Sequence, residues 1–442
     1  VRNLREHASD DPESEARMLE AKRFWGLLKT SWMMATVLGP ALVPPRERWA
    51  AVALFATFPP LVWMAAGLQT ELAATAVLLA LASLLLAPAR EAVTPRAWFA
   101  GAILVAGLFA LKLVHVAAVL PLLAYAAWRH RRARGWALLP LAAAVALVLG
   151  TSSHLHAWLA TGNPVLPMFN HVFASPYFPP EQFNDPRWHA GVSADLLWRI
   201  TFDTTRYVEG WDGGLGFALI ALAGLWAWRL VQPPHRALFL AVTLVVVLPL
   251  LPLQYARYTW PGIVLLSALL AFGAEATLGR RAFAWLFAGL CVLNLAYQAN
   301  SSWLHHSAAV KRTIRGLGDH DAVLPHYLPE RILLRAVPRA EADLVLATDP
   351  ARNVVAELAG RGRTVSPHDP SLAADAARAN ADGSGAAWAA LLARERIRWA
   401  LVTRATASPA LDAGLRRAGA TRADALEGIE LWALPTTTEA AR

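Results

Sequence analysis

Long apolar runs without charged residues dominate the first two-thirds of this chain. Between about residues 24 and 298, runs of close to 20 residues follow one another, separated by short charged connections. A helix of about 20 residues crosses the hydrocarbon core of a bilayer, where only helices or closed barrels satisfy the backbone. The runs lack the alternation of barrel strands. They therefore predict a polytopic α-helical membrane protein with about eight or nine transmembrane helices.

Composition agrees with a membrane-embedded first part, because the chain is 56% hydrophobic with a mean hydropathy of +0.37. Soluble proteins are less apolar than this. The expected helical segments, with ends uncertain by a few residues, are 24–43, 50–68, 72–87, 97–111, 114–128, 136–157, 214–230, 237–253, 260–278 and 282–298.

Residues 300–442 have the composition of a soluble domain, in which short strand patterns alternate with helix patterns. Such alternation predicts a small α/β layer. Strands are expected over 344–348, 363–366, 397–403 and 429–435, helices over 353–359, 386–396 and 410–418, and a surface helix and loop over 371–386. The predicted organisation is thus a polar segment 1–23, a transmembrane domain 24–299 and an α/β domain 300–442.

The net charge of +9 is concentrated in short connections between apolar runs, at 46–48, 90–96, 129–134, 229–236 and 280–281. Basic connections face the cytoplasm in membrane proteins, so the charge indicates orientation and not nucleic-acid binding. The basic connections alternate with the others. The others, namely 69–71, 112–115, 156–213, 254–259 and the C-terminal domain, are therefore expected outside the cytoplasm.

The same alternation of connections places residues 1–23 outside the cytoplasm, ahead of a first helix that runs inward. We expect either a further transmembrane helix upstream of Val1 or an interfacial helix over 24–43, which contains Lys29. Cys291 is the single cysteine, and His154, His156 and His171 lack a metal-ligand spacing, so no metal site or cofactor is predicted.

Three ionisable residues stand at the expected outer ends of helices: Glu71, Lys112 and Arg257. An ionisable residue in a membrane segment indicates function by default, and a carboxylate at a helix start also interacts well with the helix dipole. Snorkelling of Lys112 to the interface is the simpler alternative. Two outward cations suit an anionic headgroup, because Arg offers phosphate a bidentate fork and Lys a point charge.

The connection 156–213 is longer than two helices need, and long ordered loops are often functional. Its candidate substrate contacts are Asn163, His171, Asp203 and Arg206. An aromatic belt resting on the headgroups is the alternative. An outward carboxylate could act as general base towards a hydroxyl, and the acidic N-terminal residues Asp10 and Asp11 are candidates.

The order of these features resembles the bacterial membrane glycosyltransferases of the GT-C fold, related to protein mannosyltransferases and the aminoarabinose transferase of lipid A. The resemblance rests on the paired apolar runs around Glu71 and on GLFALKLVHVAAVLP, with Lys112 and Pro121 at matching positions. It rests also on TGNPVLPMFN, DGGLGF and ARYTWPGIVLLSALLA. The resemblance covers most of the chain, although the family's first helix and part of its first outer loop have no counterpart here.

The resemblance implies a transferase of the bacterial inner membrane that takes a sugar from a polyprenyl-phosphate donor and passes it to an envelope glycan, lipid or protein. It implies catalytic carboxylates among Asp10, Asp11 and Glu71, and donor-phosphate contacts from Lys112, Arg257 and Tyr258 of the Arg-Tyr motif. Family members use no metal, or a divalent cation in some branches. A non-catalytic scaffold or transporter, and a polysaccharide polymerase or ligase, are the alternatives.

Overall fold

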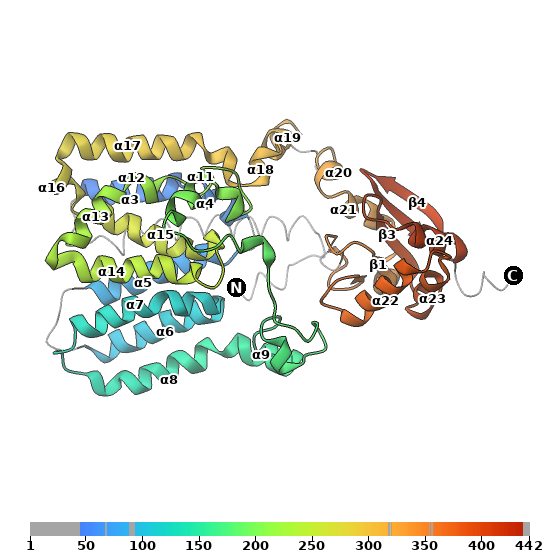
Figure 1. The fold of residues 1–442 in the computed structure, drawn as a ribbon, viewed down its shortest axis with the longest axis horizontal. Coiled ribbons are helices and arrows are strands. Elements are labelled where there is room, and N and C mark those ends of the chain that lie inside the picture. Colours follow the sequence, from blue (N-terminus) through green and yellow to red (C-terminus); the bar gives the residue numbers. More distant parts are fainter. Residues whose placement is uncertain are drawn as a thin grey trace, which may run out of the picture. The chain divides into compact units, whose positions relative to one another are not determined.

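The computed structural model describes residues 45–66, 69–87, 93–316, 319, 321–352, 354 and 357–435. The chain divides into two compact units, one of Val1–His154 and Asp185–Ala309, the other of Leu155–Asn184 and Val310–Arg442. The first unit is helical, and the second carries a small sheet (Figure 1). The N-terminal segment, the expected helix 24–43, Asp10 and Asp11 lie outside the described residues.

The helical unit contains the following elements, with short helices and 3₁₀ turns (η) between the longer ones. They are α3 (Pro45–Thr57), α4 (Pro60–Ala66), α5 (Glu71–Leu86), α6 (Pro95–Leu111), α7 (Leu113–Arg129), η1 (Trp136–Leu138), α8 (Leu139–Gly150), the start of α9 (Ser152–Thr161), η2 (Pro186–Trp188), α11 (Leu196–Phe202), η3 (Thr204–Arg206), α12 (Ala218–Ala221), α13 (Ala223–Val231), α14 (Pro233–Val247), η4 (Leu248–Leu250), α15 (Ala256–Ala271), α16 (Ala274–Leu278), α17 (Arg280–Ala296), η5 (Gln298–Ser301) and α18 (Trp303–His306).

Local sequence accounts for where the helices begin and end. α5 is a run of Ala and Leu, which favour helix, behind a single acid in the first turn. α6 begins with Pro95 at its first position, and the Thr94 side chain accepts the Ala97 N–H at 3.3 Å as an N-cap. It ends at Lys112, whose backbone is extended, and α7 then starts at once.

Four of the expected segments are broken where a single helix is predicted. The run 214–230 begins only at Ala218 and divides at Leu222, between α12 and α13. The run 50–68 divides at Phe58 and Pro59, because a proline inside a helix removes a hydrogen bond and clashes with the preceding turn. The run 260–278 divides at Gly273, which has a φ of +76°. The run 136–157 continues to Thr161 but bends by 43° between α8 and α9.

By length and composition, one helix among the described residues, Pro233–Leu250, could cross a membrane, and the bent α8–α9 pair could be a second span. The apolar helices α5, α6 and α7 are shorter than 18 residues. One or two such helices are weak evidence, since the core helix of a soluble protein has the same properties.

The helical unit has two distinct ends, which the packing of α5 on α15 defines. These helices run parallel, since Glu71 and Arg257, in their first turns, form an ion pair of 3.3 Å. At the opposite end of α15, Arg229 donates to the Phe272 carbonyl at 3.1 Å and Glu47 accepts the Gly273 N–H at 2.8 Å.

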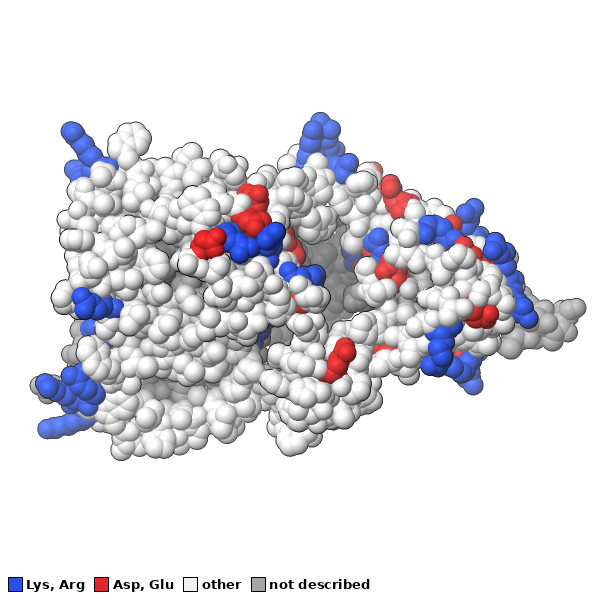
Figure 2. Space-filling view, viewed as in Figure 1, with Lys and Arg blue, Asp and Glu red and all other residues white. Residues whose placement is uncertain are grey.

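The basic connections gather at this second end. His130 bonds the Leu85 carbonyl at 3.2 Å in the last turn of α5, and Val93 donates to the Arg134 carbonyl at 2.8 Å. On the face seen in Figure 2, Lys and Arg lie at one extremity of the helical unit, charged side chains of both signs gather towards its other end, and the flank between them is nearly free of charge. The alternation of basic and other connections expected from the sequence is therefore present in the fold. We call this second end of the helical unit, where the basic connections lie, the basic end.

The second unit is built around a five-stranded sheet of order β2-β1-β3-β5-β4, in which β1 pairs in parallel with β2 and β3, and the other pairs are antiparallel. Its elements are the end of α9, α10 (Asn170–Phe173), α19 (Ala309–Arg315), α20 (Leu324–Tyr327), α21 (Pro329–Leu333), η6 (Leu334–Ala336), η7 (Arg339–Leu344), β1 (Val345–Ala347), β2 (Arg363–Thr364), α22 (Pro370–Ala381), α23 (Ala386–Arg394), β3 (Trp399–Thr403), α24 (Pro409–Arg417), β4 (Thr421–Leu426) and β5 (Ile429–Ala433).

Two apolar clusters enclose this sheet. Helices α22, α23 and α24 cover one face through Leu372, Trp388 and Leu411, and residues around Leu333 and Val337 cover the other. The predicted α/β layer and its four strands are confirmed. The predicted helix over 353–359 is wrong in its described part, where residues 357–360 form a turn that leads to Gly360 and Gly362, both with positive φ.

The sheet unit should lose stability in acid. Hydrogen bonds from Arg394 hold the pKa of Asp375 and of Glu395 below the ordinary carboxyl value, and the Ala387 N–H does the same for Asp382. A carboxyl with a depressed folded pKa contributes stability above its unfolded pKa of about 4 and loses it as pH falls further. We expect proteolysis of the sheet unit, followed in the intact protein, to be slow at pH 7 and to accelerate below about pH 4.

The Asp375→Asn variant provides the control for this pH dependence. It removes one of the depressed carboxyls, so the rate of proteolysis should rise at pH 7 and change little near pH 3. An equal effect of the substitution at both pH values would contradict the assignment.

Candidate functional site

The three ionisable residues singled out from the sequence meet at the end of the helical unit opposite the basic end. Glu71 is the first residue of α5, Lys112 joins α6 to α7, and Arg257 lies in the first turn of α15. These helices pack against one another, so the ends that carry the three side chains converge. α5, α7 and α15 all present their N-termini there.

Both cations bind one carboxylate oxygen. The Lys112 Nζ hydrogen-bonds Glu71 Oε1, and Arg257 Nε lies 3.3 Å from the same oxygen as an ion pair without a hydrogen bond. The Glu71 side chain is fully buried, whereas those of Lys112 and Arg257 are 29% and 17% exposed. The second oxygen, Glu71 Oε2, has no hydrogen-bond partner among the described residues. We call these three side chains, with Tyr255 and Tyr258, the Glu71 cluster.

Aromatic rings hold the two cations in place. Lys112 Nζ lies 4.8 Å from the centre of the Tyr258 ring, and the Arg257 guanidinium carbon lies 4.6 Å from that of Tyr255. The two tyrosine rings meet edge to face at 4.9 Å, and Trp188 stacks on Tyr255 at 4.5 Å and 13°. Cation–π contacts of this kind are stronger where the cation is partly desolvated.

The cluster carries a net positive charge, since two cations face one carboxylate and leave one positive charge over. Three helix N-termini add partial positive charge and unpaired N–H groups, which together favour an anion. Within the described residues the terminal nitrogens of Arg257 make no hydrogen bond, so its guanidinium fork is available to a planar or tetrahedral oxyanion. The arrangement can bind a phosphate, which is the headgroup chemistry expected from the sequence.

The second half of the long connection, from Asp185 onward, lies against the start of α15. Gln254 joins the two, because its N–H donates to the Trp188 carbonyl at 2.9 Å and its side-chain oxygen accepts the Gly191 N–H at 3.0 Å. Farther along, the Ala256 N–H donates to the Tyr207 carbonyl at 2.8 Å. These bonds fix the loop beside the Glu71 cluster.

Glu209 is a carboxylate beside this site that the sequence reasoning did not single out. The Tyr255 hydroxyl donates to its two oxygens, at 2.6 and 2.7 Å. Burial and this hydrogen bond raise the pKa of the Tyr255 phenol, so it stays protonated and remains a donor. Glu209 itself is exposed to solvent. In the sequence it stands in YVEGWDGG, where no spacing pattern connects it to Tyr255.

The four predicted substrate contacts of the long connection are divided between the two units of the chain. Asp203 and Arg206 form an exposed ion pair of 3.2 Å in the helical unit. Asn163 belongs to the second unit and is fully buried; its amide nitrogen donates to the Met168 carbonyl at 3.0 Å and to Asn170 Oδ1 at 3.2 Å. His171 is exposed in the same segment. Asn163 therefore shapes its own loop, and its role as a substrate contact stays a prediction.

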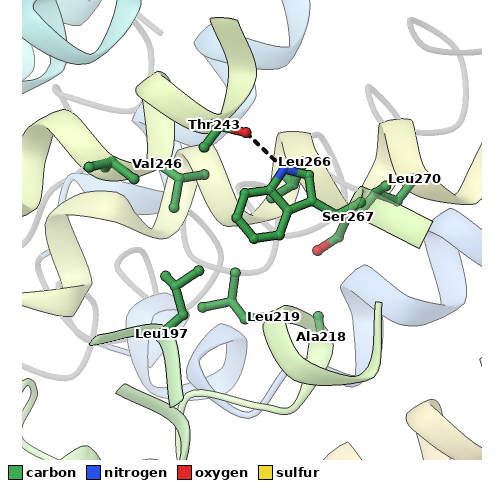
Figure 3. Close-up of a pocket in the computed structure, with 10 residues that line it drawn as sticks. Leu197, Ala218, Leu219, Thr243, Val246, Leu266, Ser267 and Leu270 are labelled. Atoms are coloured by element: carbon green, nitrogen blue, oxygen red, sulfur yellow. Dashed lines mark hydrogen bonds between the residues drawn. The ribbon is translucent and has the colours of Figure 1, made fainter. Parts of the chain in front are cut away.

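A small apolar cavity lies between α11, α12, α14 and α15, lined by Leu197, Leu219, Val246 and Leu270 among others (Figure 3). Of its polar groups, Trp226 Nε1 donates to Thr243 Oγ1 at 2.8 Å, and Ser267 adds one hydroxyl. The cavity offers no charged group to a ligand, and we assign no chemistry to it.

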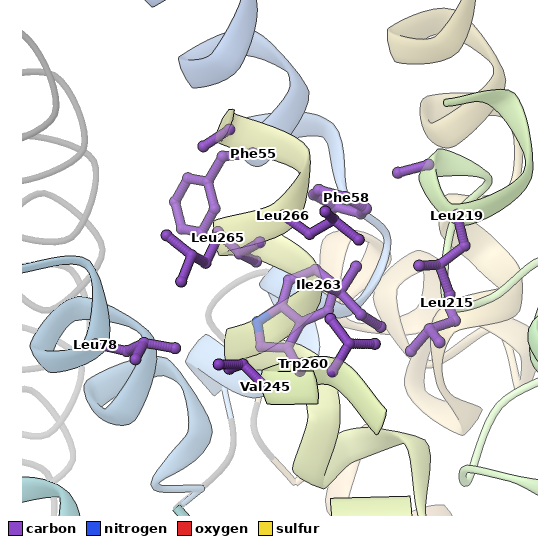
Figure 4. Packing of buried hydrophobic residues seen from close by; sticks show 14 of the residues in the cluster. Phe55, Phe58, Leu78, Leu215, Leu219, Val245, Trp260, Ile263, Leu265 and Leu266 are labelled. Atoms are coloured by element: carbon purple, nitrogen blue, oxygen red, sulfur yellow. The ribbon is translucent and has the colours of Figure 1, made fainter. Parts of the chain in front are cut away.

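Helix α15 supports the cluster from the core of the unit. Trp260, fully buried, lies among Phe58, Val245 and Ile263 (Figure 4) and meets the Phe58 ring edge to face at 4.8 Å. Arg257 and Tyr258 precede it on the same helix by three and two residues. A side chain anchored on a buried helix is held more rigidly than one on a loop.

Comparisons of the chain with protein-family profiles, with curated protein sequences and with solved structures found no match. Among the described residues, no three His, Cys, Asp or Glu side chains are grouped so as to hold a metal ion.

Proposed function

We propose that this chain is a polytopic membrane glycosyltransferase that takes a sugar from a polyprenyl-phosphate donor and passes it to an acceptor of the cell envelope. The observation that carries the proposal is the Glu71 cluster: a net positive, partly buried site where three helix N-termini meet, at the end of the bundle opposite the basic connections. That end faces away from the cytoplasm in this proposal.

Exposed apolar side chains on the long helices support a bilayer setting. Trp285 and Val292 on α17 are 79% and 66% exposed, and Leu147 and Val148 on α8 are 58% and 69% exposed. Soluble monomers rarely present large continuous apolar patches. In a membrane these side chains contact lipid, and the weakly charged flank seen in Figure 2 lies in the hydrocarbon core.

In the proposed reaction, Lys112 and Arg257 bind the donor phosphate. Charge accumulates on that phosphate as the bond to the sugar breaks, so their interaction with it strengthens in the transition state and lowers the barrier. Glu71 is fully buried and binds both cations. We therefore assign it the role of positioning Lys112 and Arg257 instead of contacting the acceptor hydroxyl.

Substitution of either cation should abolish most of the transfer. We expect Lys112→Ala and Arg257→Ala each to lower the rate by about 10²- to 10³-fold, the loss seen when one group that stabilises a developing anion is removed. Arg257→Lys should keep part of the rate, because a lysine lacks the bidentate fork. The measurement is release of polyprenyl phosphate from synthetic polyprenyl-phosphate sugars by full-length protein in nanodiscs.

The control is Arg281→Ala, which removes an exposed cation at the start of α17, at the basic end. It should keep the wild-type rate. Wild-type transfer by both Lys112→Ala and Arg257→Ala, at normal abundance in membranes, would overturn the proposed function.

A further inference from the structure

Among the described residues, Glu209 has no cation at ion-pair distance, in contrast to three other acids around the Glu71 cluster. Glu71 pairs with Lys112 and Arg257, Asp185 pairs with Arg187 at 2.7 Å, and Asp203 pairs with Arg206. Among the described residues, the hydrogen-bond partner of the Glu209 side chain is one phenol. An exposed carboxylate with most of its lone pairs unused by the protein can accept a proton from a ligand.

The position of Glu209 is fixed although the side chain is exposed. Its neighbours Val208 and Gly210 are buried, and the Tyr207 carbonyl is bonded to the first residue of α15. Tyr255, only 4% exposed, contacts the stacked Trp188 ring and the Arg257 guanidinium. The phenol that orients Glu209 is thus held by two neighbouring side chains.

Tyr255 also sets the distance between the carboxylate and the cations. Its ring contacts Arg257, and its hydroxyl, at the far end of the same side chain, contacts Glu209. One tyrosine therefore separates the phosphate-binding cation from the free carboxylate. A displacement at a sugar carbon also needs the base and the phosphate-binding cations apart, with the leaving phosphate oxygen, the carbon and the incoming oxygen in between.

From this geometry we infer that Glu209 is the general base that activates a hydroxyl acceptor, and that Tyr255 is its positioning residue. The inference rests on the proposed function. The acceptor oxygen forms a bond to the anomeric carbon and gives its proton to the Glu209 carboxylate. The bond from that carbon to the donor phosphate breaks, and its electron pair leaves on the phosphate, opposite Lys112 and Arg257. The substrate facing Glu209 is accordingly an alcohol of a glycan, lipid or hydroxylated side chain.

The test separates donor binding from turnover. Full-length protein in nanodiscs is titrated with polyprenyl phosphate, followed by tryptophan fluorescence, and its turnover of synthetic polyprenyl-phosphate sugars is measured with envelope extract as the acceptor source. Glu209→Gln should bind polyprenyl phosphate with unchanged affinity and keep the donor KM, while kcat falls about 10²- to 10⁴-fold, as for loss of a general base. Added formate should restore part of the rate of Glu209→Ala.

Two further variants control this experiment. Asp195→Asn alters another exposed carboxylate of the same loop, one whose hydroxyl partner is Ser193, and should keep the wild-type kcat. Tyr255→Phe keeps the Glu209 carboxylate but removes the hydroxyl that donates a hydrogen bond to it, so we expect about a tenfold fall in kcat at constant KM.

The outcomes distinguish the two proposals. A wild-type kcat in Glu209→Gln, with transfer lost in Arg257→Ala, overturns the role of Glu209 alone. Binding of polyprenyl phosphate without turnover of any sugar donor by the wild-type protein overturns the proposed function and the role of Glu209 together. A fall in kcat that formate does not restore, accompanied by weaker donor binding, assigns Glu209 to structure and also overturns its role as a base.

Discussion

Glu71→Gln should destabilise the helical unit by about 3 kcal/mol, because it leaves two cations side by side without their shared carboxylate. Removal of one partner of a buried ion pair costs about 3 to 5 kcal/mol, and the partial exposure of Lys112 and Arg257 favours the lower figure. The N-termini of α7 and α15 add to the repulsion, since a helix start disfavours positive charge. The measurement is the thermal unfolding midpoint of the protein in nanodiscs.

A double substitution distinguishes this charge effect from a loss of packing. Glu71→Gln combined with Lys112→Met removes one of the unbalanced cations, so the double variant should be more stable than Glu71→Gln alone. Polyprenyl phosphate should raise the unfolding midpoint of Glu71→Gln more than that of the wild type, because a bound anion replaces the missing charge. If the double variant unfolds at a lower temperature than Glu71→Gln, the carboxylate does not act through charge balance.

The convergence of Glu71, Lys112 and Arg257 could be anticipated from the sequence, because helices joined by short connections alternate in direction. Every second connection then lies at the same end, whatever the tilt of the helices. The same rule placed the basic connections together, as seen where His130 meets the end of α5. This rule predicts the end of the unit at which a residue lies, but not which residues contact it there.

Contacts between residues far apart in sequence could not be anticipated in this way. Glu209 and Tyr255 are 46 residues apart, and no spacing pattern joins a loop acid to a helix-capping tyrosine. Polar residues make the long connection a candidate binding loop, although the Asn163 side chain hydrogen-bonds the turn that contains it. A loop side chain can satisfy its own backbone or a ligand, and sequence alone does not decide which.

In the sheet unit, too, some elements could be predicted from the sequence and others could not. Strands with buried apolar residues, such as β3 and β5, could be predicted, because a short continuous apolar run between turn signals is typical of a buried strand. β4 was missed, because it is an edge strand with exposed residues TRADAL and depends on its pairing with β5. The break at Pro59 could have been read from the two adjacent prolines, whereas the break at Gly273 depends on a backbone conformation.

Gly414→Ala should destabilise the sheet unit by about 3 kcal/mol, because α24 crosses α23 where there is no room for a methyl group. A Cβ at Gly414 would lie 2.3 Å from Trp388 Cβ and 3.1 Å from the Gly385 carbonyl oxygen. Trp388 is 1% exposed and its indole N–H is bonded to Asn380 at 2.9 Å, so it cannot move aside. The helices must separate, and the apolar surface beneath α22, α23 and α24 becomes accessible.

Gly383→Ala is the matched control, since a Cβ there meets no atom within 4 Å and the backbone has no positive φ. Limited proteolysis of the full-length protein should cut the sheet unit faster in Gly414→Ala and at the wild-type rate in Gly383→Ala. The same preparations show whether sugar transfer needs an intact sheet unit. A fall in transfer that parallels the proteolysis would indicate that this unit takes part in acceptor binding, whereas wild-type transfer would confine the reaction to the helical unit. Equal proteolysis of the two variants would contradict the predicted clash.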